Sequence, residues 1–434
     1  MEDSLRQMIT EEDFRGELTG PLSDFLAVTR QFRGMLEKDS FRQYLSFLGE
    51  RAHELESFLD EYGARSNRTY AFVVKLVASS RWIARGLFAL EHLGSRFGSY
   101  VKGAASGEHQ DLLRELRQTT ELLRGSLESL HAALEEEAST LSCLEVRSTF
   151  EGADSVPGTN PGRRVLPQNL GDGEDVLEEE QRIIEIASRF ARVQDEIGKA
   201  NITGPEESVA VILKSVRSYY DEERARRLEA AMHGLQAKYD TYVRGTGLER
   251  AHPDLTELRG VASICLHLLE AGTNLIHFYE RHESGIRQEE ATDRIARIVD
   301  DSMILERVHN FVLLFVSRYA RRGREIADRL IPNFTKDVTC DLTVPSGTWV
   351  HVRPAHRIVG IVNHYGSPVQ IEIDGESCEA NSILQVMMLM GSHPDTRVIR
   401  FRGDEKPLRD LKLLFKADLG ESDKPLPEEL SYLG

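Results

Sequence analysis

The sequence predicts a protein of several domains, in which a long all-α helical bundle region precedes a small C-terminal α+β domain. Apolar residues recur at helical spacing through most of the first 334 residues. From residue 335 onward, alternating apolar stretches typical of strands are mixed with helical stretches. With 434 residues, the chain is long enough for two or three domains.

One segment interrupts the helical region. Residues 148–174 are rich in Gly, Pro, Asn and Asp, and the apolar periodicity disappears there. This composition is typical of a flexible linker or a long loop. We therefore expect a helical domain at residues 1–147, a linker or loop at 148–174 and a second helical domain at 175–334.

The two helical segments are weakly similar to each other. Residues 55–62 resemble residues 235–242, and each stretch is followed by a polar turn and a long amphipathic helix. The triplet Val-Ala-Ser occurs at 77–79 and again at 261–263. A duplicated bundle and a chance result of helical composition both remain open. In either case, the long amphipathic segments predict the packing of a helical bundle.

The sequence shows no pattern of a metal or cofactor site, so we expect neither. The four cysteines stand far apart, without the spacing of a zinc site or a disulfide framework: Cys143, Cys265, Cys340 and Cys378. His277 and His282 are five residues apart, so they do not share one helix face. We interpret the histidines of the helical region as ordinary core or surface residues. The helical region has no Walker loop, Rossmann fingerprint or Ser-His-Asp signature.

Charge and hydropathy restrict the kinds of partner that this protein can bind. The formal net charge of −17 argues against a nucleic-acid surface. The longest apolar run, residues 311–316, is too short to cross a bilayer, so we expect no membrane insertion. The first residues are acidic and lack the pattern of a signal peptide, and the unpaired cysteines suit a reducing compartment. We expect a cytoplasmic protein, and the sequence leaves its oligomeric state unknown.

The most informative residues lie just after the first alternating stretch of the C-terminal domain. His351 is followed by Arg353 and Pro354, and proline is well tolerated in the first turn of a helix. We therefore expect His351 at a helix N-terminus, where unpaired N–H groups and the helix dipole attract an anion. The guanidinium of Arg353 can bind two phosphate oxygens, and the same field favours the neutral, nucleophilic imidazole of His351.

The other elements of this domain follow from local patterns. Alternating apolar residues predict strands at residues 338–344, 369–373, 377–379 and 397–402. Helical spacing predicts helices at about residues 353–365, 383–390 and 408–414. Asp374 and Gly375 form a turn pair typical of a hairpin. Ser382 is expected to cap the second helix, because serine is a favoured N-cap residue.

From about residue 339 to residue 421, the chain resembles the HPr phosphocarrier domain of the phosphoenolpyruvate-dependent phosphotransferase system. His351 and Arg353-Pro354-Ala355 match the His-x-Arg-Pro-Ala signature of the family. Ser382 falls where the family carries its regulatory serine, 31 residues after the histidine. The resemblance implies an open-faced sandwich of four antiparallel strands with three helices on one face. We therefore expect an HPr-like domain at 335–421 and a C-terminal tail at 422–434.

The resemblance also implies a function. The protein is expected to be a phosphocarrier or a phosphorylation-dependent regulatory protein, an intermediate in phosphoryl transfer rather than a turnover enzyme. His351 accepts the phosphoryl group from an enzyme I type donor and passes it to a downstream acceptor protein, while Arg353 stabilises the phosphate. The helical domains then serve partner binding or output.

Several residues near the site are expected to face these partners. The expected docking residues are Trp349, Ile383, Leu384 and Met387. Ser382 is a candidate regulatory phosphorylation site, and a serine kinase is left open as a further partner. Trp349 departs from the family, in which a glycine is usual at this position, and it can narrow the approach of a donor protein.

An alternative reading has no phosphorylation at all. In that reading the protein is a helical scaffold or signalling adaptor, and the HPr-like domain is a docking module. The two readings differ in whether Trp349 blocks His351.

Overall fold

The structure is a computed structural model. It describes residues 8–101, 107–145, 176–283, 289–345, 351–421 and 426–433. The predicted linker at 148–174 and the predicted docking residue Trp349 lie outside the described residues.

The chain forms two compact units, and each unit takes its residues from separate stretches of the sequence. The first unit comprises residues 1–167, 197–231 and 263–319. The second comprises residues 168–196, 232–262 and 320–434. The domain boundaries expected from the sequence stay a prediction.

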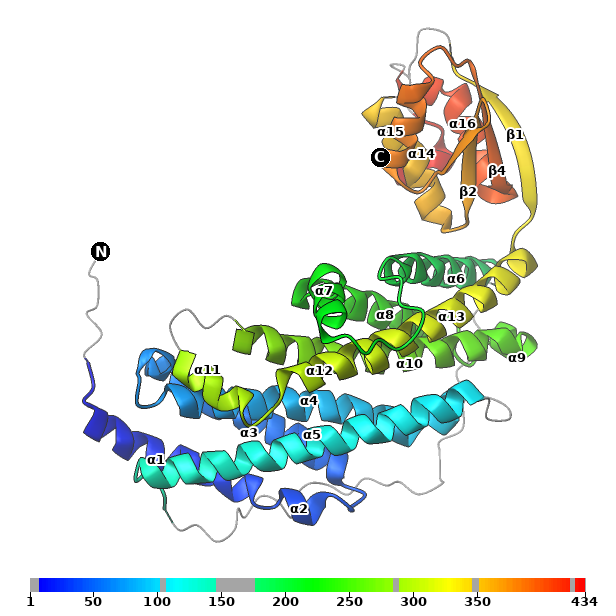
Figure 1. The fold of residues 1–434 in the computed structure, drawn as a ribbon. Helices are drawn as coiled ribbons and strands as arrows, with labels where there is room; N and C mark the ends of the chain where they lie inside the picture. Colours follow the sequence, from blue (N-terminus) through cyan, green and yellow to red (C-terminus); the bar gives the residue numbers. More distant parts are fainter. Residues whose placement is uncertain are drawn as a thin grey trace. The chain divides into compact units, whose positions relative to one another are not determined.

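In the first unit, long helices pack around one apolar helix (Figure 1). The N-terminal elements are α1 (Glu11–Thr29), α2 (Phe32–Met35), α3 (Phe41–Glu61), η1 (Ala64–Ser66), α4 (Ala71–Tyr100) and α5 (Gly107–Thr140). Helix α4 packs against both α3 and α5. Its side chains explain this position, because Leu76, Leu87 and Leu90 are fully buried and a helix that is apolar on most faces belongs in a core.

The second part of the helical region is also almost entirely α-helical. Its elements are α6 (Val176–Gly198), α7 (Val209–Tyr219), α8 (Glu222–Tyr242), α9 (Gly247–Ala251), α10 (Pro253–Glu283), α11 (Glu289–Ala296), α12 (Asp301–Arg307), the π-helical η3 (Val308–Leu313) and α13 (Leu314–Phe334). The all-α prediction for this region is confirmed. The helix lengths are compatible with a duplication, since α3 and α8 both have 21 residues and α4 and α10 have 30 and 31. The duplication stays a prediction.

One described stretch passes a simple test for a membrane span. Pro253–Arg281 in α10 is long and apolar enough, but 89% of its most apolar window is buried inside the protein. Core helices of soluble proteins pass the same test, so this stretch is weak evidence for a membrane protein.

The C-terminal part of the second unit is the predicted α+β sandwich. Strands β1 (Asp337–Thr343), β2 (Val369–Ile373), β3 (Glu376–Glu379) and β4 (Val398–Asp404) form an antiparallel sheet in the order β1-β4-β2-β3. Alternate residues of β2 are buried and exposed, so one face of the sheet meets the core and the other meets solvent. Helices α14 (Val352–Tyr365), α15 (Ile383–Ser392) and α16 (Glu405–Lys416) share that core (Figure 1). The predicted fold class is therefore confirmed.

The connections of this domain have local causes. The β2–β3 hairpin turns at Asp374 and Gly375, both with positive φ (48° and 90°), as a two-residue turn of the I′ type requires. Beyond α16, the chain forms η4 (Asp418–Gly420) and η5 (Glu428–Leu433). The segment predicted as a tail packs on the same domain in its described part, because Leu430 is fully buried and the Tyr432 hydroxyl donates a hydrogen bond to Asp410.

Candidate functional site

His351 lies at the N-terminus of α14, where the sequence predicts it. Its backbone is extended, and its carbonyl accepts the first intrahelical hydrogen bond, from the N–H of Ala355 at 2.9 Å. The ring Nδ1 lies 3.4 Å from the backbone nitrogen of Arg353. Since a backbone N–H only donates, Nδ1 accepts this hydrogen bond and carries no proton. The unprotonated nitrogen of the ring is therefore the one that faces the helix N-terminus.

The other ring nitrogen faces a carboxylate that the sequence analysis did not single out. His351 Nε2 lies 3.2 Å from Oε2 of Glu421. With Nδ1 as the acceptor, Nε2 carries the ring proton and donates a hydrogen bond to this carboxylate. Glu421 thus selects the tautomer of His351 and fixes the ring orientation.

Two arginines also bind Glu421. Arg357 Nη1 lies 3.2 Å from Oε1, and Arg353 Nη1 lies 3.6 Å from Oε2. The side chain of Arg357 is 19% exposed, whereas that of Arg353 is 66% exposed. Arg357 also donates to the Leu419 carbonyl at 2.9 Å, so it is a fixed part of the site. Arg353 is the more exposed cation and the one accessible to an approaching anion.

A tight turn after α16 brings Glu421 to this position. Asp418, Leu419 and Gly420 all have positive φ, at 54°, 56° and 71°. Two consecutive non-glycine residues in this region cost of order 1 kcal/mol each or more, and such strain persists only where the surroundings enforce it. Leu419 is fully buried in the domain core, which provides that constraint. A Cβ atom on Gly420 would approach Arg357 Nη1 to 2.6 Å, so the turn also needs its glycine.

Ser382 is the N-cap of α15, as expected. Its hydroxyl accepts a hydrogen bond from the Gln385 N–H at 3.4 Å. The residue is half-buried and heads a helix whose Val386 and Met390 are fully packed in the core. Capping accounts for serine at this position without any modification.

A comparison with family models finds a match to the PTS HPr component phosphorylation site over residues 338–415. The match covers the sheet, the three helices and His351. Residues 338–415 form an HPr-type domain. This assigns to the C-terminal domain a phosphocarrier-like role in the phosphotransferase system, whose enzymes are the kind of partner that HPr domains contact. A comparison with curated proteins and one with solved structures each give no match.

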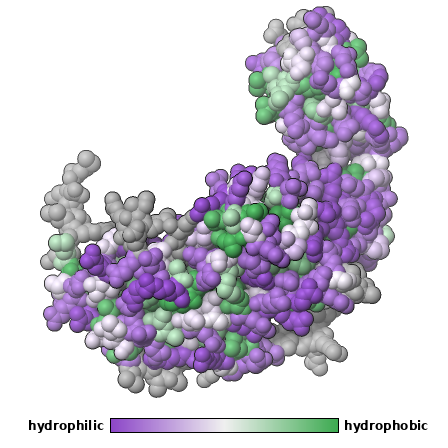
Figure 2. Space-filling model, viewed as in Figure 1, coloured by the Kyte–Doolittle hydropathy of each residue, from purple (hydrophilic) through white to green (hydrophobic). Residues whose placement is uncertain are grey.

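The apolar surface of the HPr-type domain differs in part from the expected docking residues. Leu384 is 69% exposed, while Ile383 and Met387 are half-buried against the core. Three exposed apolar residues among the described ones were not predicted: Val352 directly after His351, Met388 on α15 and Val398 on β4. Figure 2 shows hydrophobic side chains gathered on the surface of this domain where Figure 1 places α15.

Sequence reasoning missed Glu421 and Arg357. Arg357 could have been found, because it stands four residues after Arg353 on the predicted helix and therefore on the same side. Glu421 gave no such signal, since its contact with His351 depends on the turn after α16. Among the described residues, no group of three or more His, Cys, Asp or Glu side chains is placed to hold a metal ion.

Proposed function

We propose that the protein is a phosphocarrier, or a regulatory protein controlled by phosphorylation, of a phosphotransferase system. His351 accepts a phosphoryl group from an enzyme I type donor, and a downstream protein receives it. The observation that carries this proposal is the orientation of the His351 ring, with Nδ1 at the helix N-terminus and Nε2 held by Glu421.

The nucleophile in this proposal is Nδ1. Its lone pair forms the bond to phosphorus while the bond between phosphorus and the leaving nitrogen or oxygen of the donor breaks. The ring proton stays on Nε2 and remains hydrogen-bonded to Glu421. The carboxylate stabilises the positive charge that develops on the imidazole. The N–H groups of the first turn of α14 then face the transferred phosphoryl oxygens.

The two arginines at the site support the binding of an anion, but a phosphoryl group has to compete with Glu421 for them. Arg353 and Arg357 already hold the carboxylate of Glu421. A phosphoryl group on Nδ1 adds about two negative charges next to that carboxylate. We infer that Arg353, the more exposed cation, turns from Glu421 to the phosphoryl group, because the guanidinium binds a dianion more strongly than a carboxylate.

Partner docking is proposed for the surface around α15. Leu384, Met388 and Val352 are exposed apolar side chains on α15 and on the first turn of α14, the helix that begins beside His351. Exposed apolar side chains of this kind suit transient binding of a donor and an acceptor. Ser382 at the head of the same helix is the proposed regulatory site. The helical region is proposed to bind a partner or to carry the output, in the cytoplasm of a bacterium.

Phosphorylation with a defined donor tests the proposal. The full chain is incubated with phosphoenolpyruvate and enzyme I from several related bacteria, and the label is followed by intact-protein mass spectrometry. We expect one phosphoryl group that is labile in acid and stable in alkali, as a phosphoramidate is. His351→Ala should abolish it, and His356→Ala, an exposed histidine on the same helix, should leave it unchanged. Label that persists in His351→Ala, or no label with any donor, contradicts the proposal.

The adaptor reading is the second candidate, and one observation favours it. Glu421 already satisfies His351, Arg353 and Arg357 without a phosphate, so the site is stable as an internal ion cluster. In that case the domain docks partners through the same apolar residues of α15. Absence of labelling together with retained partner binding is the result that this candidate predicts.

A further inference from the structure

A pocket in the first compact unit has no part in the phosphoryl chemistry proposed above. It has a volume of about 420 Å³ and lies between α4, η1, the end of α3 and the end of α10. Pockets that bind small ligands typically enclose 300–1,000 Å³, so this one is large enough for a small metabolite. All of its lining residues belong to the described part of this unit.

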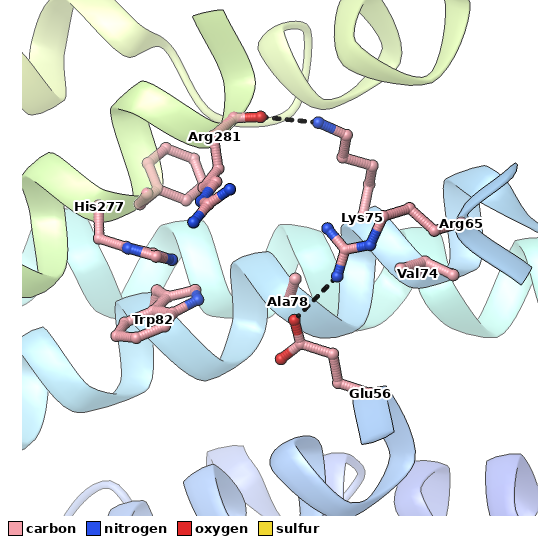
Figure 3. Close-up of a pocket in the computed structure, with 9 residues that line it drawn as sticks. Glu56, Arg65, Val74, Lys75, Ala78, Trp82, His277 and Arg281 are labelled. Atoms are coloured by element: carbon pink, nitrogen blue, oxygen red, sulfur yellow. Dashed lines mark hydrogen bonds and ion pairs between the residues drawn. The ribbon is translucent and has the colours of Figure 1, made fainter. Parts of the chain in front are cut away.

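The pocket is positively charged, although the chain carries a net charge of −17. Arg65, Lys75 and Arg281 line it, with Glu56 as the carboxylate among the lining residues. Figure 3 shows these side chains around one open space, with Ala78 and Trp82 along its wall. The three cations come from three different elements, so they approach that space from different directions.

The three cations differ in how they are held, and the pKa of Arg65 is raised by its hydrogen bond to Asp60 and by its proximity to Glu56. Arg65 pairs with Asp60 at 3.0 Å and with Glu56 at 3.4 Å, but Glu56 also binds Arg81 at 2.7 Å. Lys75 donates to the backbone carbonyl of Arg281 at 2.8 Å, which leaves its charge without compensation from that contact. Burial lowers the pKa of Lys75, and the positive charges of Arg65 and Arg281 lower it further. An anion in the pocket would relieve this repulsion.

One wall of the pocket is aromatic. The Trp82 ring lies with its centroid 3.7 Å from that of His277, and the guanidinium carbons of Arg81 and Arg85 lie 4.8 and 5.1 Å from the Trp82 ring. His277 is in turn held by Glu222, at 2.8 Å from Nδ1. These side chains present a partly apolar surface next to the cations.

We propose that this pocket binds a small organic phosphate, with the phosphate among Arg65, Lys75 and Arg281 and the organic part against Trp82. Guanidinium groups match the oxygens of a phosphate in pairs, and a tetrahedral dianion can be reached from three directions at once. A carboxylate has two oxygens in one plane, so it contacts three cations from different directions less well than a phosphate does. The negative charge of Glu56 repels any anionic group of the ligand that lies next to it. A ligand hydroxyl at that position would donate a hydrogen bond to the Glu56 carboxylate.

Calorimetric titration of the full chain with phenyl phosphate, inorganic phosphate and succinate tests the proposal. We expect phenyl phosphate to bind most tightly, because it alone combines a phosphate with an aromatic ring. Lys75→Gln and Arg281→Gln should each weaken its binding by about tenfold or more, since each removes a charge-assisted contact. The exposed Arg96→Gln on the same helix α4 is the matched control and should leave binding unchanged.

Loss of binding in a pocket variant is informative only if the variant folds. Arg281 is exposed, so Arg281→Gln is expected to fold normally, which a thermal melt verifies. No binding of phenyl phosphate at millimolar concentration, or binding that neither pocket variant weakens, overturns the proposal. Succinate or inorganic phosphate binding as tightly as phenyl phosphate overturns the choice of an organic phosphate. His351→Ala should bind phenyl phosphate normally, so failure of the phosphocarrier proposal does not decide this one.

Discussion

The carboxylate of Glu421 lies 3.2 Å from Nε2 of His351, although 70 residues separate the two in sequence. This contact gives the HPr-type domain an internal anion next to the proposed phosphoryl site. The same carboxylate binds Arg353 and Arg357, so any phosphoryl group on His351 meets a competitor for both cations.

Glu421→Gln should increase the phosphorylated fraction of His351 at equilibrium. Glutamine can still accept the hydrogen bond from Nε2, but it removes a negative charge from beside the phosphoryl group. Two unit charges about 4 Å apart repel by roughly 1 kcal/mol in water and by more in a half-buried site, so we expect a several-fold rise. Mass spectrometry at limiting phosphoenolpyruvate measures this fraction.

Glu429→Gln is the control for that substitution, because Glu429 is exposed on η5 of the same domain. It should leave the phosphorylated fraction at the wild-type level. A fall in Glu421→Gln would show that the carboxylate assists transfer more than it competes.

Arg353→Ala should retain the fold and slow phosphoryl transfer to His351. Its side chain is 66% exposed, so little packing is lost, whereas one charge-assisted contact to the phosphate disappears. Such a contact contributes roughly 1.5–3 kcal/mol, or about 10 to 100-fold in rate. Quenched-flow labelling measures the rate, with the exposed Arg397→Ala as the control. Equal rates in the two variants would remove Arg353 from the mechanism.

Ser382→Asp should weaken partner docking and leave the fold intact. The helix dipole tolerates a negative charge at the N-cap of α15, but that charge stands on the same helix as the exposed Leu384 and Met388. The measurement is titration with the phosphoryl donor at several salt concentrations. Ser377→Asp introduces the same charge on the exposed strand β3 and should have a smaller effect. Unchanged affinity in Ser382→Asp counts against regulation at this residue.

Leu430→Ala should destabilise the HPr-type domain. Leu430 is fully buried in its core, so the substitution removes buried apolar surface and leaves a cavity. We expect a loss of about 2–4 kcal/mol in the free energy of unfolding, measured by urea denaturation. The exposed Glu428→Ala is the control in the same segment. A loss below about 0.5 kcal/mol would mean that the C-terminal segment is a loose tail, as the sequence suggested.

Limited proteolysis should cut the chain first within residues 148–174. Gly and Pro-rich segments bury little surface and expose their backbone to proteases. N-terminal sequencing and mass spectrometry of the first fragments locate the cuts. First cleavages inside α4 would show that the predicted boundary between the helical domains is wrong. The fragments can stay associated after cleavage, since the compact units take residues from both sides of this segment.

The sequence by itself determined the order of strands and helices in the HPr-type domain, the cap at Ser382 and the place of His351 at a helix start. These features depend on the alternation of apolar residues and on residues such as Pro354 that act over a few positions. They could be predicted because their causes are local in the chain.

Only the tertiary structure decided which distant residues meet. Glu421 reaches His351 because three residues of positive φ, held by the buried Leu419, turn the chain back after α16. The rings of Trp82 and His277 meet because α4 and the part of α10 from residue 263 onward lie in one compact unit. The periodicity of either helix does not show which other helix it packs against. Such contacts form through packing between elements, whose energy is non-directional and leaves no pattern in the local sequence.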